Sequence, residues 1–83
     1  MAIREIDGKT IRKWREKAGI TQSALAEIAG VPESRAQTTV SEWESGRRHP
    51  SYQQRLKLLR FFTRKGNEDA KAILADQIAE LMT

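Results

Sequence analysis

Residues 21–48 constrain this chain most, because they contain two short helical patterns separated by a glycine. Thr21 precedes the first pattern, and its hydroxyl suits the N-cap position, where it accepts a backbone N–H of the first turn. Gly30 ends that pattern, because glycine readily takes the left-handed conformation that terminates helices. A second pattern follows, in which Val40 and Trp43 are the only large apolar residues. Two compact helices around one bend are therefore predicted.

The second of these helices has the composition of a helix that contacts the base edges of DNA. Its two apolar residues are three positions apart and form one narrow buried stripe. Its outward positions are small and polar, namely Gln37, Thr38, Ser41 and Glu42. Gln can pair with adenine and Glu can accept from cytosine N4, so these residues predict direct readout in a major groove. For Glu42 an alternative stays open. Its carboxylate would be repelled by the DNA phosphates and stay out of the interface unless it accepts a hydrogen bond from cytosine N4.

A longer set of motifs resembles the Cro/C1-type (XRE) helix-turn-helix family. The motifs are Ala18-Gly19-Ile20-Thr21-Gln22, Leu25-Ala26, Gly30-Val31, Val40-Ser41-Glu42-Trp43-Glu44 and residues 46–51. The resemblance carried by these motifs covers roughly residues 9–62. The resemblance implies an all-α, lambda-repressor-like domain of five helices. It also implies a DNA-binding transcriptional regulator, here a repressor that binds an inverted repeat as a homodimer.

The resemblance also implies roles for single residues. Gln22, in the first turn of the helix after Thr21, matches the family's glutamine that binds a backbone phosphate. Arg15 matches an arginine that pairs with the glutamate near the end of the reading helix, which is Glu44 here. Arg47 and Arg48 follow that helix directly, and a planar guanidinium suits phosphate. These two arginines are therefore predicted to bind the flanking backbone.

The turn before the reading helix departs from the family pattern. Residues 32–36, Pro-Glu-Ser-Arg-Ala, make it roughly four residues longer than the usual three or four. In one interpretation Pro32 is the first residue of an extended helix. In the other, which we prefer, Ser34 caps the helix and Gln37 completes a capping box. Arg35 would also contact bases if this turn approaches DNA.

Periodicity predicts three further helices and an extended arm. Residues 1–6 form the arm. The first helix starts at Asp7 or Gly8 and buries the stripe Ile11, Trp14 and Ala18. The fourth spans residues 51–63 behind a capping box of Ser51 and Gln54. Its predicted core stripe is Tyr52, Leu56, Leu59 and Phe62. Asn67 caps the fifth helix, whose stripe is Ala70, Leu74, Ile78 and Met82.

Apolar residues of the fourth and fifth helices that the domain core does not need predict a dimer. Residues 1–66 are expected to form the DNA-binding domain, with its helix-turn-helix at 21–46, and residues 67–83 a C-terminal dimerisation helix. Half of that helix would fold back on the fourth helix, and the rest would form the dimer contact. The residues assigned to dimerisation are Leu58, Phe61, Leu74, Ile78, Leu81 and Met82.

Charge and composition exclude several other functions. The net charge is +4, with five basic and no acidic residues at 51–66 and one basic and four acidic residues at 67–83. The acidic tail should therefore point away from a polyanion. There is no cysteine, and the only histidine, His49, has no metal-ligand or triad spacing, so we expect no metal, no cofactor and no enzymatic activity. A cytoplasmic protein without a membrane segment is expected. The alternative function is an antitoxin whose residues 67–83 bind a toxin protein.

Overall fold

A computed structural model describes residues 6–82 as five α-helices around one hydrophobic core. In chain order the elements are α1 (Gly8–Lys17), α2 (Gln22–Ala29), the 3-10 turn η1 (Glu33–Arg35), α3 (Ala36–Ser45), α4 (Tyr52–Arg64) and α5 (Glu68–Leu81). No strand occurs among these residues, so the predicted all-α fold of five helices is confirmed. The arm predicted at residues 1–6 lies outside the described part, except for Ile6, which is buried.

The helix boundaries follow from side chains that cap the first turns. In four helices the residue before the first turn accepts a hydrogen bond from the backbone N–H three positions later. These residues are Asp7, Thr21, Ser51 and Asn67, at 2.7, 3.0, 3.2 and 2.9 Å. The capping box at Ser51 is complete, since its N–H donates to Gln54 Oε1 at 2.8 Å. Gly30 ends α2 with a φ of 82°, as predicted.

The turn before α3 differs from the preferred prediction. Directly after Pro32 the chain forms η1, closed by a hydrogen bond from the Arg35 N–H to the Pro32 carbonyl at 3.0 Å. Arg35 then leaves the helical region, with φ −121° and ψ 7°, and α3 begins at Ala36 without a side-chain cap. The capping box of Ser34 and Gln37 is therefore wrong, because Ser34 lies within η1. The other interpretation, in which Pro32 is the first residue of an extended helix, is closer to the structure, because helical backbone starts directly after Pro32.

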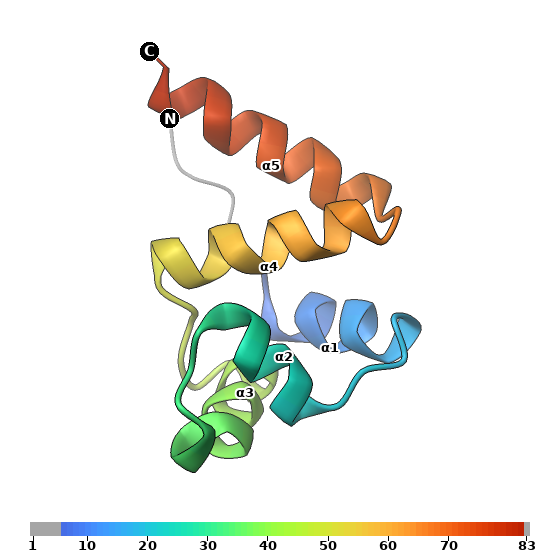
Figure 1. Cartoon of the computed structure of the whole chain (residues 1–83). Helices are drawn as coiled ribbons and strands as arrows, with labels where there is room; N and C mark the ends of the chain where they lie inside the picture. The colour runs from blue at the N-terminus through green and yellow to red at the C-terminus, as the bar shows by residue number, and fades with distance from the viewer. Residues whose placement is uncertain (1–5, 83) are drawn as a thin grey trace.

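The core gathers residues from all five helices. The six largest side chains that are fully buried are Ile11, Leu25, Val40, Leu58, Leu59 and Phe62. Trp14 packs edge-to-face on Phe62, with ring centroids 5.4 Å apart, and so joins α1 to α4. In Figure 1, α3 and α5 lie at opposite ends of the molecule, and α4 crosses between them. The end that carries α3 is therefore remote from the C-terminal helix.

The inner face of α4 is wider than the predicted stripe. Leu58, Leu59 and Phe62 are buried, whereas Leu56 and Tyr52 of the predicted stripe are half-buried. The reason is that α4 packs on α2 on one side and makes an extensive contact with α5 on another. Leu58 is only 1% exposed, so its assignment to a dimer surface is wrong.

The inner face of α5 is rotated from the predicted stripe. Ala70 and Gln77 are buried, and Ile73 and Leu74 pack against the core. A repeat of four residues advances 400° at each step, so a stripe written every fourth residue drifts 40° per step around the helix. The last members of the predicted stripe therefore leave the core. The large apolar residues that are exposed in the described part of the chain are Ile78, Leu81 and Met82, at 45, 66 and 82%.

Candidate nucleic-acid interface

Helix α3 has a buried face and an opposite polar face. Ala36, Val40 and Trp43 are buried. At 100° per residue, Thr38, Ser41 and Ser45 lie opposite the buried face, and Gln37 and Glu42 lie at the two sides of this polar face. Gln37, Thr38, Ser41 and Ser45 are exposed, and Glu42 is partly exposed. The geometry leaves this polar face free for a partner outside the chain.

A close backbone approach docks the end of α3 on the start of α1. A Cβ built on Gly8 would lie 2.3 Å from the Trp43 carbonyl oxygen and 2.6 Å from that of Glu44. Ordinary contacts of a Cβ atom are 3.4–4 Å, so only glycine fits between the two helices. Gly8 therefore fixes how near α1 comes to the last turn of α3.

An ion pair between Arg15 and Glu44 joins the same two helices. Arg15 Nε donates to Glu44 Oε2 at 2.6 Å and Arg15 Nη2 to Glu44 Oε1 at 3.3 Å. Arg15 Nη1 donates to the Ile20 carbonyl at 3.1 Å. The two side chains are 14 and 7% exposed. The hydrogen bond to Glu44 raises the pKa of Arg15, so the guanidinium stays protonated. Its two parallel bonds hold α3 in one orientation.

Gln22 is part of the same network. Its Nε2 donates to Glu44 Oε1 at 3.1 Å, which leaves one N–H of the amide for another acceptor. The position in the first turn of α2 is the predicted one, but the structure adds a partner on α3. Glu44 therefore orients the amide that was predicted to bind phosphate.

A recess of about 280 Å³ opens beside this network. Its lining residues are Arg12, Arg15, Gln22, Ser41, Glu44 and Ser45. The sequence interpretation did not single out Arg12 or Ser45. The sequence did contain a signal for Arg12 at this recess: it lies three residues before Arg15, which places both side chains on one face of α1. Arg12 is exposed and forms a pair with Glu16 at 3.6 Å.

Arginines lie at both ends of α3. Arg35 precedes its first turn and is exposed. Gly46 ends the helix with a φ of 82°, and the exposed Arg47 and Arg48 follow. Arg48 Nε lies 3.4 Å from Glu42 Oε2, so the carboxylate on the polar face has a cationic neighbour.

The structure offers no metal site or membrane span in the part that it describes. Among residues 6–82 no three His, Asp or Glu side chains are grouped closely enough to hold a metal ion. No helix of the described residues has the length and apolar character needed to cross a bilayer.

The comparisons with known proteins agree with this geometry. A family model described as helix-turn-helix matches residues 11–65, which include α2, η1, α3 and α4 and most of α1. No curated protein and no solved structure matches the chain. The family match covers well over half of the 83 residues and contains the network of Arg15, Gln22 and Glu44. The chain therefore belongs to the Cro/C1-type helix-turn-helix family of DNA-binding transcriptional regulators.

Proposed function

We propose that this protein is a repressor that binds a specific inverted-repeat operator as a homodimer. The observation that carries the proposal is the polar face of α3, which is exposed and has arginines at both ends. Such a face suits a major groove, which admits an α-helix and displays a different pattern of donors and acceptors for each base pair. A dimer on the operator would block polymerase sterically.

Base reading falls to the residues on that face. Gln37 lies in the first turn of α3, the end that enters the groove in helix-turn-helix proteins. Thr38 and Ser41 supply hydroxyls to base edges beside it. Arg35 adds a guanidinium if η1 lies close to the DNA. The side chains of Glu42 and Arg48 are paired in the free protein. Glu42 therefore accepts a hydrogen bond from cytosine only after Arg48 leaves it to bind a phosphate.

Phosphate binding is assigned to residues that line the recess and to the two arginines that follow α3. Gln22 retains one free amide N–H beside the N-terminus of α2, where backbone N–H groups favour anions. Arg47 and Arg48 extend the positive surface past the end of α3. Arg12 lines the same recess and is a further candidate. These contacts position the protein on DNA but do not read its sequence.

A salt titration tests the division between reading and positioning. We expect Arg47→Ala to weaken binding to any duplex and to reduce the slope of log affinity against log salt by about one. Lys71→Ala is the control, because it removes an exposed cation from α5 at the opposite end of the molecule. Fluorescence anisotropy of a labelled duplex measures both. Equal effects of the two substitutions would contradict the proposed orientation.

The dimer is proposed to form through the end of α5. Ile78, Leu81 and Met82 are exposed there, far from α3. Of the other residues predicted for this contact, Phe61 and Leu74 are half-buried, so only the exposed part of each side chain could contact the partner. Two linked α3 helices would bind half-sites about one helical turn apart, roughly 10 base pairs centre to centre. Linkage makes the second contact intramolecular and so raises the affinity.

Sedimentation tests the dimer contact. The double substitution Leu81→Glu with Met82→Glu should give a folded monomer of the 9.5 kDa chain. Asp76→Lys, which changes the charge at an exposed position about 160° around α5 from Ile78, should leave the dimer intact. A wild-type chain that sediments as a monomer would contradict the proposal. The same apolar surface would then be free for a toxin, as the antitoxin alternative requires.

A further inference from the structure

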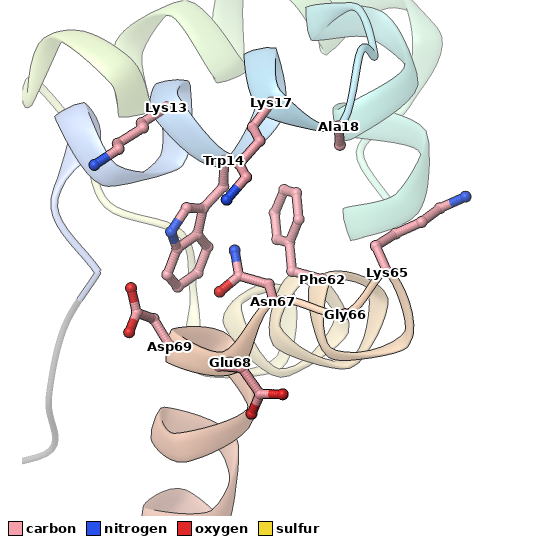
Figure 2. A pocket seen from close by; sticks show the side chains of 10 residues that line it. All are labelled: Lys13, Trp14, Lys17, Ala18, Phe62, Lys65, Gly66, Asn67, Glu68 and Asp69. Atoms are coloured by element: carbon pink, nitrogen blue, oxygen red, sulfur yellow. The ribbon is translucent and has the colours of Figure 1, made fainter.

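A second cavity lies on the other side of α1, between its last two turns and the turn from α4 to α5 (Figure 2). Its volume is about 380 Å³, within the range of small-molecule sites. Lys13 and Lys17 line it from α1, and Lys65 lines it from the α4–α5 turn. The helical spacing places these α1 residues opposite Arg12 and Arg15, which line the recess beside α3. A ligand here would not compete with DNA for space.

One wall of this cavity offers donors to an anion. Figure 2 shows the Lys17 side chain reaching into the cavity toward the amide of Asn67. Asn67 Oδ1 is already occupied, because it caps α5 by accepting from the Ala70 N–H at 2.9 Å. The two N–H groups of its Nδ2 therefore remain for a ligand. Within residues 6–82, none of the three lining lysines has an ion-pair partner.

The start of α5 also offers acceptors to a cation. Asp69 and Glu68 line the cavity from the first turn of α5, and neither has an ion-pair partner in the described part of the chain. Figure 2 shows the Asp69 carboxylate near the Trp14 ring. Trp14 and Phe62, packed edge-to-face, are the aromatic part of the lining, and Figure 2 shows the Trp14 ring between the Asp69 carboxylate and the Asn67 amide. A simple dianion would be repelled by these carboxylates, and a simple cation would be repelled by Lys17, whose ammonium group reaches into the cavity (Figure 2).

We propose that this cavity binds a small zwitterion with an aromatic body, that is, a free aromatic amino acid or a compound of that form. Its carboxylate would lie between Lys17 and the Asn67 amide, its ammonium group beside Asp69, and its ring against Trp14. The inference does not depend on DNA binding, because the cavity shares no lining residue with the recess beside α3.

Nuclear magnetic resonance of the full ¹⁵N-labelled chain tests the proposal with three probes. L-phenylalanine carries both charges, 3-phenylpropionate lacks the amine, and 2-phenylethylamine lacks the carboxylate. We expect L-phenylalanine at millimolar concentration to shift the Trp14 indole and Asn67 side-chain amide signals saturably. The two analogues should bind at least about tenfold more weakly, because each lacks one charged hydrogen-bonding group. The Trp43 indole, on the buried face of α3 and away from this cavity, is the internal control and should not shift.

Substitutions then test whether Lys17 and Asp69 bind the two charged groups of the ligand. Lys17→Gln and Asp69→Asn should each weaken L-phenylalanine binding at least about tenfold. Lys9→Gln removes an exposed cation from α1 that does not line the cavity, and should leave binding unchanged. Three results would overturn the proposal: no saturable shift with L-phenylalanine, equal binding of the three probes, or equal binding by the Lys17 and Lys9 variants.

Discussion

Removal of the Glu44 side chain should strongly destabilise this protein. In the native chain the carboxylate accepts two hydrogen bonds from Arg15 and one from the Gln22 amide. In Glu44→Ala the Arg15 guanidinium keeps only the Ile20 carbonyl, although its side chain is just 14% exposed. A cation would then remain largely out of water without a counterion, which is more costly than the loss of the hydrogen bonds alone.

The magnitude follows from the burial of the pair. Breaking a buried ion pair costs about 3–5 kcal/mol. The retained bond to Ile20 and the partial exposure of Arg15 place Glu44→Ala at the lower end, about 3 kcal/mol. A domain of 83 residues has roughly 4–12 kcal/mol of stability, so the variant should fold but melt roughly 12–24 °C lower.

Urea unfolding followed by circular dichroism measures this effect in a double-mutant cycle. Arg15→Ala with Glu44→Ala should lower the free energy of unfolding by less than the sum of the single substitutions, because the double variant contains no buried charge without a counterion. The exposed pair Arg12 and Glu16 is the matched control, with side chains 64 and 57% exposed. Its coupling should be only about 0.3–0.5 kcal/mol.

The outcome that refutes this reasoning is a small effect at Glu44. If Glu44→Ala cost no more than Glu16→Ala, water would solvate Arg15 in the folded state, and the ion pair would not fix α3. Glu44→Gln provides a second measurement if the alanine variant does not fold. It keeps one acceptor oxygen and should unfold at a urea concentration between those of Glu44→Ala and the wild type.

Three further predictions concern other parts of the chain. Gly8→Ala should destabilise by about 1–3 kcal/mol through overpacking, because its Cβ would meet the Trp43 carbonyl; stabilisation in urea unfolding would contradict the observed approach of α1 and α3. Gln77→Leu should stabilise by about 1 kcal/mol, because the buried Oε1 of Gln77 has no hydrogen-bond donor among residues 6–82; a lower Tm would mean that this oxygen is satisfied in solution. The hydrogen bonds from Thr10 lower the pKa of Asp7 below its ordinary 3.8, so the stabilisation is complete above that pH and is lost as pH falls through the lowered pKa. In Asp7→Asn, whose amide also caps but does not titrate, this part of the acid dependence of Tm should disappear.

Local features were predictable because neighbouring residues determine them. The caps at Thr21 and Asn67 and the glycine that ends α2 lie where the sequence placed them. They depend on one side chain and the first turn of the same helix. The inserted turn was harder. A hydroxyl at Ser34 satisfied the capping pattern, but the chain closed a 3-10 turn onto Pro32 instead.

Contacts between helices were less predictable. The predicted stripe on α5 assumed a repeat of four residues, and the difference from 3.6 moved Ile78 and Met82 away from the core. The widened face of α4 buried Leu58, because α5 folds along α4. At the candidate site, the bond from Gln22 to Glu44 depends on how α2 crosses α3, which no pattern within either helix encodes.

Selection of bound sites from random duplex DNA tests the central claim most directly, because that claim is sequence reading by the polar face of α3. The wild-type chain should enrich one inverted repeat. Gln37→Ala should enrich the same repeat with one position per half-site degenerate, since the lost pairing is worth about 1–3 kcal/mol of discrimination. If the wild-type chain enriched no sequence, or if both proteins enriched identical sites, Gln37 would not read a base and the proposed orientation of α3 on DNA would be contradicted.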